Sequence, residues 1–230
     1  MAFAGFDSLA YPGDDVMAWL KSNTNLTFVG FYLAPAPSRP SSAWMPKRST
    51  VVNQGWGLAP VYVGQQEATQ PGSHDLTAEQ GKIDGLDAAK LMRAAGFPDG
   101  STVYLDCEAG GPASVAAADY IKAWGRALNS VGSFAAGIYC SHTTVPSLLQ
   151  ILPPLAVWTW NLVDLTPTSP QFPVKSPGDS GVMRACVWQY AQNTTIEFAG
   201  SAVPSLKLDL DCAAVPDPSK LPSGADAAIA

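Results

Sequence analysis

Short apolar runs alternate with segments of helical periodicity over the first two thirds of the sequence. Residues 77–96 show the helical pattern most clearly. Thr77 and Gln80 match a capping box, in which each side chain satisfies a free backbone N–H of the other residue, and Gly96 supplies a helix stop. Between them, apolar positions recur at i, i+3, i+4 and i+7, namely Ala88, Leu91, Met92 and Ala95. The segment is therefore predicted to be an amphipathic helix that packs on a core.

The apolar runs predict eight β-strands. They lie at residues 2–7, 28–33, 58–64, 102–108, 134–139, 155–160, 186–190 and 206–210. Helices are predicted at residues 14–20, 47–54, 77–96 and 117–128, with a short one between 139 and 155. No amphipathic helix precedes either of the last two strands.

Strands and helices in this order favour one fold class. They predict an α/β fold, a single closed (β/α)8 TIM-type barrel of parallel strands with degenerate or missing helices in the last third. An open doubly wound sheet is the alternative, but GFDSLAYPG at the first strand contains no glycine-rich phosphate turn. We expect the barrel domain to span 1–215, followed by a loose C-terminal tail at 216–230. The Pro- and Ser-rich loop at 35–46 is a candidate binding loop.

Composition and charge narrow the classes of partner. The net charge is −6 and basic residues do not cluster beyond Lys47-Arg48, which argues against nucleic acid. No apolar run approaches the roughly 20 residues of a membrane span. The first seven residues lack the basic segment of a signal peptide, so we expect none in this chain. Export by another route, action inside the cell and prior removal of a leader stay open. We expect a monomer.

Cysteine and histidine spacing does not indicate a metal or a cofactor, and we expect neither. The two histidines are too few for a zinc site built from imidazole, and the cysteines form no CxxC pair. Reduced core thiols are the favoured state of the four cysteines. Two disulfides stay possible if the strands are adjacent, Cys107–Cys140 and Cys186–Cys212.

The fourth predicted strand ends in two carboxylates, in the stretch TVYLDCEAGGP. Side chains alternate across a strand, so Asp106 and Glu108 point to the same face, about 6.6 Å apart along the backbone. Like charges held this close raise the proton affinity of one of the two. The pair is typical of acid catalysis, although a structural pair bonded to backbone amides or to a cation is the alternative.

Other polar and aromatic residues stand at the ends of the predicted strands, where a barrel carries its functional groups. These candidates are Asp7, Tyr32, Gln66, Tyr139, Trp158, Trp160, Gln189, Asp209 and Asp211. An acidic pocket with aromatic walls suits a sugar, because rings stack on Trp and Tyr and a carboxylic acid can protonate the glycosidic oxygen. Five of them have a plainer alternative: Asp7 as a helix-capping or turn residue, the two tryptophans as barrel filling, and the last two acids as calcium ligands.

The motifs resemble a known family. GFD, YLDCE, GIYC, VWQY and LDLD occur in the order seen in glycoside hydrolase family 25 muramidases. FVGFYL, PVYVGQQ and DGLDAAK are closer to their bacterial glycoside-hydrolase-like relatives, formerly of unknown function. The likeness extends to about Ala214. It departs from family 25 at Phe31-Tyr32, where a basic residue is common, and at Asp211, where asparagine is usual.

The resemblance implies a glycosidase that acts on an N-acetylated polysaccharide of the peptidoglycan type, outside the cytoplasm or on the cell wall. It implies that Glu108 is the general acid, that Asp106 steadies the substrate's N-acetyl group during substrate-assisted retention, and that Asp7 and Asp209 complete the acidic floor. Tyr32, Gln66, Tyr139, Trp158, Trp160, Gln189 and Asp211 are then expected to bind substrate. A glycan-binding module without turnover and a structural or partner-binding scaffold are the alternatives.

Overall fold

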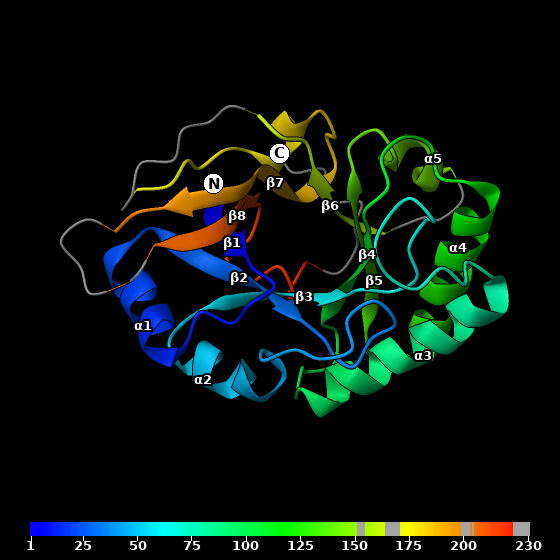
Figure 1. Ribbon diagram of the computed structural model, residues 1–230, viewed down its shortest axis with the longest axis horizontal. Coiled ribbons are helices and arrows are strands. Elements are labelled where there is room, and N and C mark those ends of the chain that lie inside the picture. The colour runs from blue at the N-terminus through cyan, green and yellow to red at the C-terminus, as the bar shows by residue number, and fades with distance from the viewer. Residues whose placement is uncertain (151–154, 164–170, 199–202, 204, 223–230) are drawn as a thin grey trace.

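The chain forms a closed eight-stranded barrel, described in a computed structural model for residues 1–150, 155–163, 171–198, 203 and 205–222. Each strand pairs with the next in chain order, and the last pairs with the first (Figure 1). The strands are β1 (Phe3–Asp7), β2 (Leu26–Tyr32), β3 (Gly57–Tyr62), β4 (Thr102–Cys107), β5 (Ala135–Ser141), β6 (Ala156–Trp160), β7 (Ala185–Ile196) and β8 (Leu206–Ala213). The predicted α/β barrel is confirmed.

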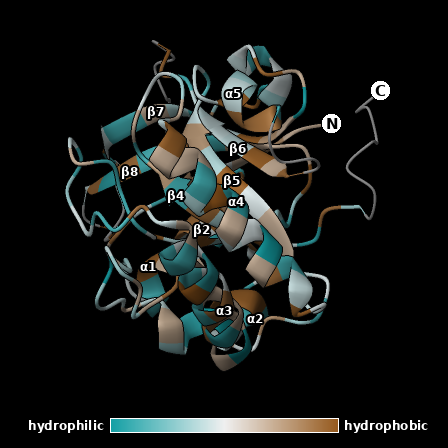
Figure 2. Ribbon diagram, turned by 90° about the vertical axis from the view of Figure 1, so that its right-hand side faces the viewer, coloured by the Kyte–Doolittle hydropathy of each residue, from teal (hydrophilic) through white to brown (hydrophobic). Residues whose placement is uncertain are grey.

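Helices cover the barrel mainly on the side of the early strands. They are α1 (Asp14–Asn23), α2 (Arg48–Asn53), α3 (Ala78–Ala94), α4 (Val115–Ser130) and α5 (Val145–Leu149), with short 3₁₀ turns η1 (Met45–Lys47) and η2 (Pro177–Ser180). Figure 1 shows α3 and α4 side by side along one flank. Both helices carry hydrophilic and hydrophobic residues (Figure 2), and their buried residues recur at spacings of three and four, as in amphipathic helices that pack on a barrel. Within the described residues only η2 lies between β6 and β7, in keeping with the predicted loss of late helices.

The direction of the last strand corrects the expected parallel barrel. Strands β1 to β7 pair in parallel, but β8 is antiparallel to both of its neighbours, β7 and β1. A parallel return needs a crossover of a dozen or more residues, usually helical, whereas only the nine residues 197–205 separate β7 from β8 in the sequence. The mouth of the barrel therefore meets the first half of β8 and not its end.

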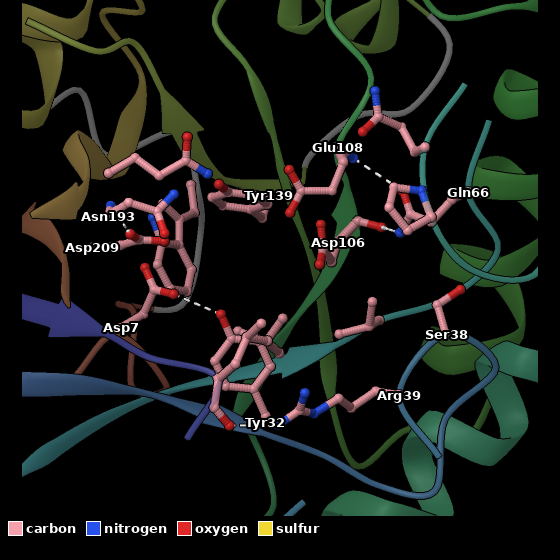
Figure 3. A pocket seen from close by; sticks show the side chains of 17 residues that line it. Asp7, Tyr32, Ser38, Arg39, Gln66, Asp106, Glu108, Tyr139, Asn193 and Asp209 are labelled. Carbon is pink, nitrogen blue, oxygen red and sulfur yellow. Dashed lines mark hydrogen bonds between the residues drawn. The ribbon is translucent and has the colours of Figure 1, made fainter. Parts of the chain in front are cut away.

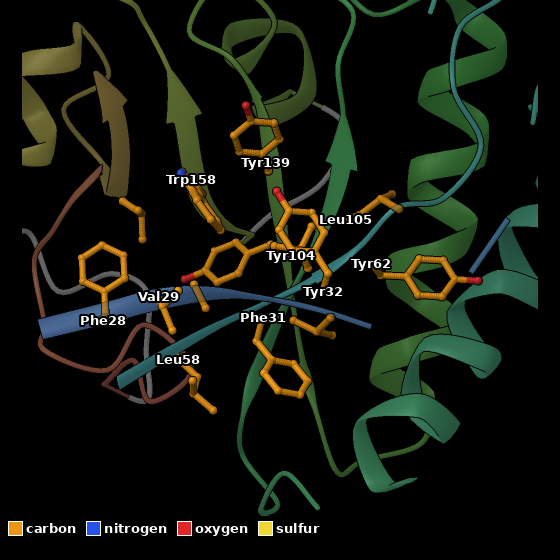
Figure 4. Close-up of a cluster of buried hydrophobic side chains, with 14 of the residues drawn as sticks. Phe28, Val29, Phe31, Tyr32, Leu58, Tyr62, Tyr104, Leu105, Tyr139 and Trp158 are labelled. Carbon is orange, nitrogen blue, oxygen red and sulfur yellow. The ribbon is translucent and has the colours of Figure 1, made fainter. Parts of the chain in front are cut away.

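Aromatic side chains fill the barrel beneath the mouth (Figure 4). The Trp158 ring is 1% exposed and lies edge-on to Tyr104 and Tyr139, with ring centroids 5.6 and 5.2 Å apart. Its indole N–H donates to Asp211 Oδ1 over 3.0 Å. The edge-to-face ring pairs and the hydrogen-bonded indole hold Trp158 in one orientation. Its ring therefore forms a rigid floor under the mouth of the barrel.

All four cysteines are free, which agrees with the favoured reduced thiols and not with the two disulfides left open. Cys107 and Cys140 are register partners on β4 and β5 but are not bonded. The Cys186 thiol donates to the Val157 carbonyl over 3.1 Å, and the Cys212 thiol donates to the Pro173 carbonyl over 3.4 Å. Each of the last two thiols thus has a backbone partner of its own.

The segment 216–222 is held against the bottom of the barrel, so the predicted looseness of the tail is wrong for these residues. The Ser219 N–H donates to the Leu58 carbonyl over 2.7 Å, and the Thr102 N–H donates to the Ser219 carbonyl over 2.8 Å. Asp217 accepts from the Leu58 N–H. The segment thereby joins the starts of β3 and β4, and the rest of the predicted tail, 223–230, lies outside the described residues.

One detail at the start of α3 differs from expectation. Thr77 caps α3 as predicted, since its hydroxyl accepts from the Gln80 N–H, but the Gln80 amide donates to Asp84 and not to the backbone of Thr77. Only half of the capping box forms. Asp84 is 2% exposed and therefore competes for that amide as a buried acceptor.

One glycine on α3 and one on α4 give a stability prediction. A Cβ at Gly85 would lie 2.4 Å from the Trp124 carbonyl oxygen, whereas the nearest atom to a Cβ at Gly125 would be 3.8 Å away. Alanine gains about 1 kcal/mol over glycine in a helix, and overpacking costs about 1–3 kcal/mol. We expect Gly85→Ala to lower the free energy of unfolding and Gly125→Ala to raise it by up to about 1 kcal/mol. Urea unfolding measures both, and a stabilised Gly85→Ala variant would contradict the close packing.

Candidate active site

A cavity of about 380 Å³ opens at the mouth of the barrel (Figure 3). The structure brings eight of the predicted site residues to its wall. They are Asp7, Tyr32, Gln66, Asp106, Glu108, Tyr139, Trp158 and Asp209. The four acids, predicted on the first, fourth and eighth strands, thus share one cavity.

Asp7 and Asp209 face each other across the seam between β1 and β8, where they are register partners. Asp209 reaches the mouth because β8 is antiparallel, not because it ends a strand as predicted. Asp7 accepts from the Tyr32 hydroxyl over 2.6 Å and from the Gln189 amide over 3.4 Å. A Cβ at Gly30 would lie 2.5 Å from Cβ of Asp7, so only glycine there leaves room for this carboxyl group.

The Gln66 side chain holds the segment that carries Asp106 and Glu108. Its amide N–H donates to the Asp106 carbonyl over 2.9 Å, and its amide oxygen accepts from the Glu108 N–H over 3.1 Å. Both ends of the amide are therefore used on backbone. Gln66, predicted to bind substrate, is placed to fix the two acids relative to each other.

Asp106 and Glu108 differ in burial. Asp106 is 5% exposed, and its Oδ1 is buried with no hydrogen-bond partner. Glu108 is only partly buried and lines the cavity more openly. The orphaned oxygen of Asp106 is an acceptor that a ligand N–H can satisfy, since an unmet buried acceptor is costly.

Burial raises the pKa of every acid in the cavity. Loss of solvent, and then the charge of Asp209, raise the pKa of Asp7 to about 8. Burial and the nearby Glu108 raise the pKa of Asp106 well above its ordinary value. Burial and Asp209 raise the pKa of Glu108, while a hydrogen bond with Asp106 opposes that shift. The cluster therefore retains protons near neutral pH.

Three predicted residues lie outside the cavity wall. Gln189 is 1% exposed and accepts from the Tyr139 hydroxyl over 2.6 Å. Asp211 is buried below the cavity, where it accepts from Trp158. Trp160 is half-buried beside Gly110. Gln189 and Asp211 support the cavity residues from below, and none of the three is placed to contact a ligand in it.

Sequence reasoning missed several residues of the wall. Ser38 and Arg39 come from the loop predicted as a binding loop, but neither was singled out. Gln192 and Asn193 come from the irregular part of β7, where the register with β8 shifts twice. Asn193 has a φ of 54° and its N–H donates to Asp209. Asparagine tolerates a positive φ better than most residues. That tolerance is the only feature of the sequence that points to Asn193.

Two observations on the described part of the chain concern membrane spans and metal ligands. No helix there is long and apolar enough to cross a bilayer. Nor does that part contain a group of three His, Cys, Asp or Glu side chains that could hold a metal ion. Asp209 and Asp211, considered as calcium ligands, have other partners: Asp209 accepts from the Asn193 N–H and Asp211 from Trp158.

The raised pKa of Asp7 predicts a pH dependence of stability. The folded state holds a proton up to about pH 8, whereas the unfolded state releases it near pH 4. Stability from this group is therefore full below about pH 4 and is lost as the pH rises towards 8, at up to about 1.4 kcal/mol per pH unit. Asp7→Asn should flatten that slope in urea unfolding, and Asp15→Asn, an exposed control on α1, should not. Equal slopes in wild type and Asp7→Asn would contradict the shift.

Solved structures share the fold at low sequence identity. The Tat-secreted protein Rv2525c of Mycobacterium tuberculosis is 15% identical with a TM-score of 0.56, and the match covers 91% of this chain and 94% of that one. A family 25 glycosyl hydrolase from Bacillus anthracis is 13% identical with a TM-score of 0.56, over 93% and 89% of the two chains. The bacterial lysozyme of Streptomyces coelicolor is 13% identical with a TM-score of 0.60, over 95% and 97%. At these identities the likeness shows the fold.

Sequence comparison is more specific. No curated protein matches the chain. The profile of the Rv2525c-like, glycoside hydrolase-like domain matches residues 18–197, which include β2 to β7 and both Asp106 and Glu108. The resemblance to glycoside-hydrolase-like proteins is thereby confirmed. The chain belongs to the family of Rv2525c-like, glycoside hydrolase-like domains.

Proposed function

We propose that the protein is a glycoside hydrolase that cleaves an N-acetylated polysaccharide of the peptidoglycan type, as a lysozyme-like muramidase does. The observation that carries the proposal is the pairing of Asp106 and Glu108 at one cavity. Asp106 offers a buried oxygen without a partner, and the more open Glu108 has a raised pKa. An N-acetyl group needs such an acceptor for its N–H, and a leaving group needs such an acid.

The geometry supports substrate-assisted retention. Asp106 accepts the N–H of the N-acetyl group and turns its carbonyl oxygen towards the anomeric carbon. That oxygen forms a bond to the carbon as the glycosidic C–O bond breaks, and Glu108 gives its proton to the departing oxygen. Water then attacks the anomeric carbon of the cyclic intermediate, Glu108 takes a proton from it, and the N-acetyl group is restored. Such schemes are a known exception to the rule of two carboxylates.

Asp7 and Asp209 would serve this reaction as a polar floor. Asp7 is held by Tyr32 and Gln189, and Asp209 by the Asn193 N–H. Both can bond sugar hydroxyl groups above the Trp158 floor. Charge on Asp209 also helps to keep the proton on Glu108.

A glycan-binding module without turnover is the second candidate, and one observation favours it. The hydrogen bond between the two carboxyl groups raises the pKa of Asp106 and lowers that of Glu108. A proton that stays on Asp106 leaves Glu108 unable to protonate a leaving group. Catalysis then depends on whether the substrate amide, by demanding an acceptor, moves the proton to Glu108.

We also propose action outside the cytoplasm or on the cell wall, by a monomer. The similarity to a Tat-secreted protein and to a bacterial lysozyme supports the location. Peptidoglycan lies there, so the location follows from the proposed substrate.

Substitution of Glu108 tests the general acid. Glu108→Gln keeps the shape and removes the transferable proton, so kcat should fall about 10²–10⁴-fold on purified peptidoglycan. Mass analysis of released fragments measures the loss, and Glu79→Gln, exposed at the start of α3, is the control. If wild type releases no fragment while both forms bind glycan equally, the binding module is supported. If both cleave equally, Glu108 is not the acid.

Asp106 should act on the same transition state. Asp106→Asn should slow formation of the cyclic intermediate, with a smaller loss of kcat for substrates that carry a good leaving group. The double variant with Glu108→Gln should then lose much less than the product of the two single losses. Steady-state kinetics on an aryl glycoside and on peptidoglycan compare the four forms, and fully multiplicative losses would show that the two acids work independently.

A further inference from the structure

The cavity contains one cation that none of its acids neutralises. Arg39 is the only Lys or Arg among the described residues that line it, beside four carboxyl groups. The ion pairs among the described residues join Lys47 to Asp14 and Lys220 to Asp217, and neither involves Arg39. Arg39 is therefore not present to pair with the acids.

The loop holds Arg39 in place through its backbone. The N–H of Ala36 donates to the Arg39 carbonyl over 2.8 Å, and the N–H of Arg39 donates to the Ala36 carbonyl over 3.0 Å. Between them, the Ser38 N–H donates to the Val63 carbonyl over 3.0 Å and the Ser38 hydroxyl to the Gly64 carbonyl over 2.6 Å. This part of the loop is fastened to the end of β3.

The side chain is also positioned before any ligand arrives. Its guanidinium carbon lies 5.7 Å from the centre of the Tyr32 ring, and one terminal N–H donates to the Leu9 carbonyl. The Nε–H is buried and has no partner. Arg39 therefore keeps N–H donors without a partner, and one of them is buried away from water. Such a planar cation favours an anionic ligand, because the parallel N–H donors of a guanidinium match the two oxygens of a carboxylate.

We propose that Arg39 binds a carboxylate on the glycan, so that the cavity selects N-acetylated sugars bearing a free carboxyl group over neutral ones. The inference rests on the proposed function to the extent that the ligand is a glycan. Figure 3 shows Asp106 between Glu108 and Arg39. The carboxylate therefore belongs to the part of the glycan held at Asp106, away from the leaving oxygen that Glu108 faces.

Three probes with matched backbones test this. They are peptide-free peptidoglycan strands with free lactyl carboxylates, the same strands with those groups converted to methylamides, and neutral chitotetraose. Titration calorimetry at fixed low salt gives Kd for each. A hydrogen-bonded charge contributes about 1.5–3 kcal/mol, so wild type should bind the free acid about 10- to 100-fold more tightly than the methylamide.

Variants assign the preference to the residue. Arg39→Gln should bind the free acid about 10- to 100-fold more weakly and the methylamide unchanged, so the preference disappears. Arg39→Lys keeps the charge without the fork and should retain part of it. Arg126→Gln makes the same charge change at an exposed position on α4 and should behave as wild type. Equal melting temperatures establish that each variant is folded.

The outcomes separate this inference from the proposed hydrolysis. Selective binding of the free acid without released fragments upholds the role of Arg39 and overturns the hydrolase. Cleavage of both strand types at equal rates and with equal affinities upholds the hydrolase and overturns the role of Arg39. Binding of none of the three probes overturns both, and a preference that persists in Arg39→Gln assigns it to another residue.

Discussion

Closure of the barrel by an antiparallel β8 is the constraint on which the site depends. The strand fills the gap between β1 and β7, and its direction makes Asp209 the register partner of Asp7. A parallel β8 would have turned its later residues, beyond Asp211, towards the mouth. The acidic floor, the shifted pKa of Asp7 and the contact of Asn193 with Asp209 all follow from that one reversal.

A second layer of contacts supports the catalytic edge. Asp84, buried on α3, accepts from Tyr120 over 2.7 Å, from Gln65 over 3.2 Å and from Gln80 over 2.7 Å. The Gln65 N–H in turn donates to the Tyr120 hydroxyl over 3.1 Å. Gln65 directly precedes Gln66, the residue that bridges the backbone of Asp106 and Glu108. Two outer helices thereby fix the loop that sets the geometry of the acids, which is the usual way in which a site is made rigid.

Much of this arrangement could be predicted from the sequence. Strands and cavity acids were accessible because apolar runs of strand length stand out and because Asp106 and Glu108 share a face by simple alternation. The direction of β8 could not be predicted, because the side chains of a strand alternate with a period of two whichever way the strand runs. Arg39 and Asn193 lie in an aperiodic loop and in a bulged strand, where no pattern reports where a side chain points. Gln66 was predicted as a site residue, but its contact with the backbone of Asp106 and Glu108 could not be predicted, because the identity of a residue does not reveal which partners it contacts.

The packing of residues 216–222 has a consequence for synthesis on the ribosome. These residues bond to the starts of β3 and β4, more than a hundred positions earlier in the chain. The strand that closes the barrel also comes late, at Leu206–Ala213. A nascent chain must therefore leave one edge of β1, and the backbone groups at the starts of β3 and β4 that bond to 216–222, without partners until residues 206–222 have emerged. Such distant contacts slow folding, and exposed edges in the meantime are sites where chaperones act.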